Sequence, residues 1–326
     1  MTALLITVDT ELSAALHLQG VALEENVRRS IWAEARGQAV GIGWQMQLLD
    51  RHGLKGVFFL DPLPALIHGV DFLKPIVGEI VRRGHEVQLH IHTEWLAWVK
   101  DSPVDGRQGR NIGDFTLADQ ILLLGLAKHL LEEAGAPPIT AFRAGNFGAN
   151  DDTLRALAAI DILWDSSVNP AYLGRECGIV ADREQIAAVP THGVIELPVS
   201  GIIDRPGGFR PAQICAMSAA EMRAGLNHAA REGHDAFVVV THSFEMLSRD
   251  RQRLNGAVMA RFEALCRTAG RMPQVRGAGF HDLSPAIADA PARGLTRVPA
   301  SRLRTGLRVA QQVLATWHYE RRLVPA

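Results

Sequence analysis

The chain has 326 residues, with 34 lysines and arginines against 35 aspartates and glutamates and 47% hydrophobic residues. This balance is typical of a globular protein with a sizeable core. The net charge of −1 gives no general attraction to phosphate backbones, so we expect no nucleic-acid partner.

Short apolar runs alternate with longer amphipathic stretches along the chain. The runs predicted as strands are 4–8, 56–60, 86–91, 139–144, 161–164, 194–199, 237–241 and 275–280. The stretches predicted as helices are around 24–50, 71–83, 116–134, 150–159, 218–232 and 250–269. A repeated strand-then-helix order implies parallel strands, in a barrel or a doubly wound sheet. Because no linker rich in proline or glycine separates two halves, we favour an α/β fold with one distorted parallel (β/α) barrel of about seven to eight strands.

The N-terminus and the cysteines bear on the compartment. The run from Met1 to Glu11 has no basic region ahead of its short apolar stretch, unlike a secretory signal or a membrane span. The three cysteines, Cys177, Cys215 and Cys266, lack CxxC spacing and favour neither a disulfide framework nor a cysteine-based zinc site. These features predict a cytoplasmic protein.

The last segment differs in charge from the rest of the chain. Residues 291–326 hold seven arginines and one glutamate, a net charge of +6, so residues 1–290 sum to −7. We expect a barrel domain over 1–290 and a basic helical tail over 291–326. Within the tail, apolar residues recur at helical spacing beside Arg304 and Arg308, at Leu303, Leu307, Ala310, Leu314 and Trp317. A helix docked on the barrel and an amphipathic helix on anionic lipid at the inner face of the membrane both fit this pattern.

Acids and histidines follow three of the predicted strands. In parallel α/β folds, functional residues gather at the C-terminal ends of strands. Strand alternation places Asp9 and Glu11 on one face of the first strand, and it places His90 and His92 together on one face of the third. His242 follows the seventh run. For Asp9 taken alone, capping of the next helix is an alternative role. The combination instead indicates a divalent-metal site with acid–base partners.

Five short sequences follow one another in order: TVDTE, GHEVQLHIHTEW, FRAGNFG, LWDSS and VVTHSFE, from residue 4 to about 245. Together they resemble the five motifs of the NodB-like polysaccharide deacetylases, carbohydrate esterase family four. The resemblance implies a NodB-like barrel and a metal-dependent hydrolase that removes an N-acetyl group from an amino sugar in a glycan or glycan precursor. The cofactor it implies is a divalent metal ion, with zinc expected first and other divalent ions as alternatives.

The first and second motifs assign the metal ligands and the base. In the family the first motif supplies a catalytic-base aspartate, and Asp9 falls on that position. The adjacent aspartate of the family is Thr10 here, so the resemblance moves the metal-ligand role to Glu11. The second motif of the family gives histidine ligands at i and i+4, and this sequence has His90 at the first of these positions and Glu94 at the second.

The second motif allows two geometries. If the chain becomes helical after His90, then His90 and Glu94 bind the metal beside Glu11. If the chain stays extended to His92, the two histidines bind as a pair and Glu94 supports the site. We favour the pair, because imidazole is the commonest metal ligand and a set richer in carboxylates suits harder ions than zinc. Both geometries stay open at this point.

The remaining motifs carry the other catalytic roles that the resemblance implies. Arg143 matches the arginine that pairs with the base, Asp165 matches the aspartate that orients the general acid, and His242 matches the general-acid histidine. Asp9 would accept a proton from water and His242 would give one to the departing amine. Loops 101–115 and 204–212 are the expected substrate walls.

Two other functions compete with this hypothesis. A metal-dependent amidohydrolase acting on another amide or ester also uses an HxH pair, although that class usually has the pair on its first strand. A catalytically degenerate deacetylase that serves as a glycan-binding module is the second alternative, and the presence of Asp9, Arg143, Asp165 and His242 together argues against it. For an active enzyme in the cytoplasm, a glycan precursor or a lipid-linked or nucleotide-activated sugar is the expected substrate.

Overall fold

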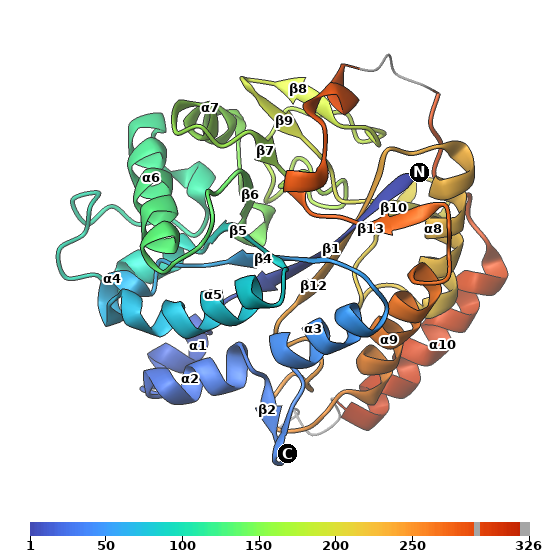
Figure 1. The fold of residues 1–326 in the computed structure, drawn as a ribbon, viewed down its shortest axis with the longest axis horizontal. Coiled ribbons are helices and arrows are strands. Elements are labelled where there is room, and N and C mark those ends of the chain that lie inside the picture. The colour runs from blue at the N-terminus through green and yellow to red at the C-terminus, as the bar shows by residue number, and fades with distance from the viewer. Residues whose placement is uncertain (290–293, 320–326) are drawn as a thin grey trace. The chain divides into compact units, whose positions relative to one another are not determined.

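The computed structural model describes residues 1–289 and 294–319, with side chains described as far as residue 313. Figure 1 shows the chain as a ribbon coloured from the N-terminus to the C-terminus. Contacts divide the chain into two compact units. Unit 1 combines Met1–Gly56, Ser200–Gly277 and Leu295–Ala326, and unit 2 combines Val57–Val199 and Ala278–Gly294. Each unit is therefore assembled from segments far apart in the sequence. The predicted boundary between 1–290 and 291–326 falls at residues outside the described ones and stays a prediction.

Buried parallel strands form the centre of unit 1. β1 (Thr2–Thr10) pairs in parallel with β12 (Ala236–His242) along most of its length and with β13 (Val275–Gly277) at its first residues, as Figure 1 shows. Every residue of β1 is buried, which is typical of a strand covered on both faces. Two antiparallel hairpins also belong to unit 1: β2 (Glu34–Ala35) with β3 (Gln38–Ala39), and β10 (Gly201–Arg205) with β11 (Gly208–Pro211).

The helices of unit 1 bury apolar side chains against these strands. Leu4 of β1 and Phe237 of β12 share one core with Leu226 and Phe262, which come from two of the helices. The helices in the described part of unit 1 are α1 (Ala14–Leu18), α2 (Leu23–Ser30), α3 (Ile42–Arg51), α8 (Ala219–Glu232), α9 (Gly256–Ala269) and α10 (Arg302–Tyr319). This shared core holds β1 and β12 in place, and polar residues begin at the C-terminal ends of these two strands.

Unit 2 is built on a second series of strands. In order across the sheet they are β4 (Gly56–Leu60), β5 (Glu86–Ile91), β6 (Ala141–Ala144), β7 (Trp164–Asp165), β9 (Val194–Glu196) and β8 (Val189–Thr191). Neighbouring strands are parallel, except that β8 runs antiparallel to β9. The helices are α4 (Ala65–His68), α5 (Leu73–Arg82), α6 (Leu117–Glu133) and α7 (Asp151–Ala159), and short 3₁₀ turns include η2 (Thr93–Trp98) and η4 (Gly145–Phe147). The rings of Phe59 and Trp164 pack on that of Phe280, at centroid distances of 5.7 and 6.0 Å.

The predicted α/β class with mostly parallel strands is confirmed. The predicted strands 56–60 and 86–91 coincide with β4 and β5. The helical stretch 24–50 was wrong in its middle, because the β2–β3 hairpin separates α2 from α3. Loop 204–212 was also wrong, because most of it forms the β10–β11 hairpin. Among the described residues, no helix is both long and apolar enough to cross a membrane.

Candidate functional site

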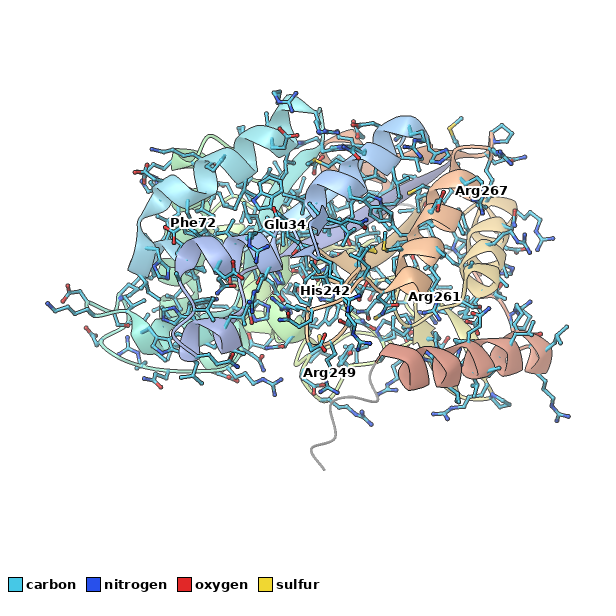
Figure 2. The ribbon with its side chains drawn as sticks, turned by 90° about the horizontal axis from the view of Figure 1, so that it is seen from below. Glu34, Phe72, His242, Arg249, Arg261 and Arg267 are labelled. Carbon is cyan, nitrogen blue, oxygen red and sulfur yellow. The ribbon has the colours of Figure 1, made fainter. Side chains whose placement is uncertain are left out.

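In unit 1, the site begins where β1 and β12 end. The register of these strands places Asp9 directly opposite His242, labelled in Figure 2. Asp9 Oδ2 lies 4.0 Å from His242 Nε2, and the Asp9 residue is only 4% exposed. Parallel pairing of two strands thus delivers a carboxylate and an imidazole to the same point. Glu11 follows one residue after β1 and is half-buried.

A second carboxylate holds the other side of the His242 ring. Glu245 Oε1 lies 3.3 Å from His242 Nδ1. Glu245 is itself held by Thr241, whose hydroxyl donates to it at 2.7 Å, and by Gln213, whose amide donates at 3.3 Å. The sequence prediction missed Glu245, although its place in VVTHSFE, three residues after a histidine, is a signal for such a pair.

The charges around His242 decide its protonation. Burial by itself would lower the pKa of His242, but the carboxylates of Glu245, Asp9 and Glu11 outweigh burial and raise the pKa to about 9. Burial likewise raises the pKa of Glu245, but the hydrogen bond and charge of His242, together with hydrogen bonds from Cys215 and Thr241, outweigh burial and make the net shift downward. At neutral pH, His242 is therefore an imidazolium ion beside ionised Glu245, and it has a proton to give.

In unit 2, β5 and the residue after it present two histidines. The backbone of His92 is extended, with φ −114° and ψ 103°, and the 3₁₀ turn η2 starts only at Thr93. The rings of His90 and His92 lie on the same side, with centroids 5.0 Å apart and planes inclined by 74°. The chain thus takes the extended one of the two predicted geometries, and Glu94 lies in the turn that follows.

The tautomer of His90 is fixed by β6. His90 Nδ1 lies 2.7 Å from the carbonyl oxygen of Arg143, which is a hydrogen-bond acceptor only. Nδ1 therefore carries the proton, and Nε2 carries the lone pair. A histidine held by a backbone carbonyl in this way has the arrangement found for metal ligands.

Gly145 makes room for His92. A Cβ atom on Gly145 would lie 2.5 Å from the carbonyl oxygen of Ile91 and 2.9 Å from two ring carbons of His92, so only glycine fits there. The next two residues, Asn146 and Phe147, have positive φ angles of 55° and 56°. Residues with side chains rarely adopt this conformation, and it concentrates at functional turns. The AGNFG segment is thus a constrained turn that packs closely against His92.

Arg143 is a fully buried cation. Its guanidinium Nε donates to the carbonyl oxygen of Ser166 at 3.1 Å, and Nη2 donates to the Ser166 hydroxyl at 3.2 Å. The guanidinium carbon also lies 4.5 Å from the centre of the Phe59 ring. Burying a cation has a large desolvation cost. These contacts hold the guanidinium in one orientation.

Two buried carboxyl groups face each other at the ends of β7 and β9. Asp165 and Glu196 are register partners, and Asp165 accepts hydrogen bonds from the hydroxyl of Ser167 at 2.7 Å and from its backbone N–H at 3.1 Å. Burial raises the pKa of both groups, and the charge of Asp165 raises that of Glu196 further. Of the two groups, Glu196 therefore holds a proton more readily than an ordinary glutamate does. The sequence prediction missed Glu196, although a single acidic residue inside the apolar run VIELPV is a signal for a buried carboxyl group with a polar partner.

The predicted site residues divide between the two units. Unit 1 holds Asp9, Glu11 and His242, and unit 2 holds His90, His92, Glu94, Arg143 and Asp165. The predicted ionic partner of His242 is Asp165, whereas the carboxylates found near His242 within unit 1 are Glu245 and Asp9. Orientation of His242 by Asp165 stays a prediction.

Comparison with known proteins gives matches in structure. No protein-family model matches the sequence, and no curated protein matches it. A protein from Mycobacterium smegmatis assigned as a polysaccharide deacetylase matches with a TM-score of 0.56 and 18% identity, covering 92% of this chain and 94% of that one. The chain has a NodB-like polysaccharide-deacetylase fold.

A further solved structure matches with a lower TM-score. A family 4 carbohydrate esterase from Streptomyces lividans, in complex with acetate, shares 10% identity over 91% of this chain and 97% of that one, with a TM-score of 0.42. The NodB-like fold that the five motifs predict is confirmed by the Mycobacterium smegmatis structure.

Proposed function

We propose that this chain is a metal-dependent hydrolase that removes an N-acetyl group from an amino sugar. The observation that carries the proposal is the pair of buried Asp9 and half-buried His242, a carboxylate and an imidazolium ion 4.0 Å apart at two strand ends. Amide hydrolysis needs one group that accepts a proton from water and another that gives a proton to the departing amine. This pair has one group of each kind, in a deacetylase fold.

Glu11, His90 and His92 are the metal ligands in this proposal. Two imidazoles and one carboxylate form a donor set typical of catalytic zinc, which keeps a further position for water or substrate. The hydrogen bond from His90 Nδ1 to a backbone carbonyl fits this role, because it leaves the Nε2 lone pair for the metal. When bound, a divalent ion would polarise the acetyl carbonyl and lower the pKa of water. Glu94 is the alternative ligand, and zinc is the first metal to test.

The protein's own groups then divide the proton transfers. Asp9 accepts the proton of the attacking water, and Arg143 is proposed to keep it ionised. His242 gives its proton to the amine nitrogen as the carbon–nitrogen bond breaks. Glu245 keeps His242 charged until that step, because the ion pair between them favours the imidazolium ion. Asp165 is proposed to support the general acid.

The substrate is proposed to be an N-acetylated sugar of a glycan or glycan precursor in the cytoplasm. A lipid-linked or nucleotide-activated sugar fits this proposal. Segment 101–115 and the β10–β11 hairpin are proposed as substrate contacts, because they offer arginine, aspartate and phenylalanine side chains suited to sugar hydroxyls and rings.

Acetate release from a panel of N-acetylated amino sugars and oligosaccharides tests the proposal. Zinc-loaded wild-type protein should release acetate, and Asp9→Asn should lower the rate by about 10²–10⁴ because it removes the general base. Asp161→Asn is the matched control, since Asp161 is exposed in a turn at φ 58°, a conformation that asparagine also adopts. Asp9→Asn activity within a few-fold of wild type would refute the assignment. Absence of acetate from the whole panel would refute the proposed substrate class.

A further inference from the structure

The C-terminal helix α10 contacts the rest of unit 1 through polar side chains. Arg308 is only 4% exposed, and its guanidinium donates to Glu221 Oε1 at 3.0 Å and to Asp204 Oδ2 at 3.2 Å. One turn earlier, the Thr305 hydroxyl donates to the carbonyl oxygen of Asp204 at 2.9 Å. The side of α10 that faces the protein thus carries a buried ion cluster.

The apolar side of α10 faces outward. Leu303 is 74% exposed, Leu307 52%, Val309 47% and Val313 62%, and Figures 1 and 2 both show α10 as an outer element of unit 1. A surface helix of a globular protein normally does the opposite, with its apolar stripe against the core. Sequence spacing placed Arg308 beside the apolar residues of the helix, whereas the structure turns it inward, toward Glu221 and Asp204.

A groove runs between α10 and α8, with a volume of about 690 Å³. Leu303 and Leu307 of α10 give it apolar walls, while Arg223 and Arg231 of α8 and Arg304 of α10 bring positive charge to it. None of the described residues that line the groove is an aspartate or glutamate. Arg223 and Arg231 are exposed on the helix surface. Apolar surface and unneutralised cations therefore occur side by side.

We propose that α10 and this groove dock the protein on an anionic membrane surface. The exposed leucines and valines enter the boundary between headgroups and acyl chains, and the arginines of the groove bind lipid phosphates. Apart from buried Arg308, residues 291–326 hold six arginines and one glutamate, and this positive excess favours the same partner. None of these residues belongs to the proposed metal or acid–base set, so docking and deacetylation can be tested separately.

Charge distinguishes a lipid surface from a second copy of the chain. In a symmetric dimer the same patch meets itself, so the arginines of one copy would face those of the other. Such like charges disfavour association unless carboxylates intervene, and the described residues lining the groove include none. Anionic phosphates instead neutralise the arginines while the acyl region takes up the leucines.

Vesicle co-sedimentation tests the docking proposal with the full-length chain. We expect binding to vesicles of phosphatidylglycerol and phosphatidylcholine at low salt, weaker binding to phosphatidylcholine alone, and release at high salt. The double variant Leu303→Ser/Leu307→Ser should weaken partitioning by at least about ten-fold. The double variant Arg223→Ala/Arg231→Ala should weaken partitioning by about five-fold per arginine, and hence by about twenty-five-fold in total.

Matched controls separate docking from loss of folding. Leu18→Ser removes a leucine of α1 that is 73% exposed, and Arg267→Ala removes an exposed arginine of α9 outside the groove. Both controls should bind as wild type does, and all variants should keep the wild-type circular dichroism spectrum. The proposal is overturned if wild type ignores phosphatidylglycerol vesicles at low salt, or if the double variants bind like the controls. A vesicle-free dimer that Leu303→Ser/Leu307→Ser converts to a monomer would also overturn it, in favour of a second copy.

Discussion

Replacing Glu245 by glutamine removes the carboxylate nearest to the His242 ring and keeps the size of the side chain. The glutamine can still accept a hydrogen bond from Thr241, so the local packing should persist. His242 loses the partner that lies 3.3 Å from its Nδ1 and contributes most to keeping it charged. We therefore expect the pKa of His242 to fall from about 9 toward its ordinary value of 6.5.

The size of the effect on rate follows from the fraction of protonated His242. At pH 8, a pKa of about 9 leaves roughly nine-tenths of His242 protonated, whereas a pKa of 6.5 leaves about 3%. If His242 is the general acid, Glu245→Gln lowers acetate release at pH 8 by up to about thirty-fold. At pH 6 the loss should stay within about two-fold, because His242 is mostly protonated in both proteins.

A pH–rate profile for the wild type and Glu245→Gln measures this difference. The alkaline limb of the profile should move to lower pH in the variant, while the acidic limb stays in place. Titration of the His242 ring by NMR in both proteins is the direct check on the cause. A uniform loss of rate at every pH would refute the reasoning, since it would assign Glu245 a purely structural role.

Four further outcomes are expected. Gly145→Ala should weaken zinc binding about 10–100-fold in calorimetry, because the new Cβ atom would meet the His92 ring although no proposed ligand is altered. Gly78→Ala is the control, since a Cβ atom there enters open space, and it should leave zinc binding unchanged. Arg308→Met should lower the free energy of unfolding in urea by about 3–5 kcal/mol, because Glu221 and Asp204 lose a buried cation; a loss as small as that of exposed Arg267→Met would contradict this. His242→Ala should slow release of an alkyl amine far more than hydrolysis of an aryl acetate, since a phenolate leaves without a proton, and equal losses would remove His242 from the acid role. Because the pKa of His242 is raised to about 9, its protonation should stabilise the fold fully below pH 6.5, and this contribution should be lost as the pH rises through about 9. The upper bound of the contribution is about 3 kcal/mol, and denaturant titrations of wild type and His242→Ala at several pH values measure it.

The polar residues at strand ends were predictable because a parallel sheet imposes a simple rule on them. An apolar run that stops at Asp9 or His90 marks a C-terminal strand edge, and alternation along the strand fixes which neighbours share a face. These strand ends depend only on local sequence, so sequence alone could locate them. At His92 the sequence left extended and helical backbone both open, and the structure has the extended one.

The partners of these residues depend on contacts across the chain. Glu196 faces Asp165 only because β9 pairs with β7 in a particular register, which no local pattern specifies. Arg308 turns inward because Asp204 and Glu221, remote in sequence, form an anionic pocket for it. The helical pattern of 24–50 did not reveal the β2–β3 hairpin. The chain after this hairpin returns to α2, and Gly41 passes so close to the Ile31 carbonyl oxygen that a Cβ atom would overlap it.

Metal-dependent acetate release, with metal content measured on the same sample, tests the central claim most directly. Wild-type protein stripped with a chelator should stop releasing acetate from its N-acetylated substrate and recover when one equivalent of zinc is restored. His90→Ala and His92→Ala should bind less zinc and stay inactive, whereas Glu94→Ala should bind zinc and recover. Acetate release that persists in the metal-free protein, or equal zinc content in all three variants, would contradict the account.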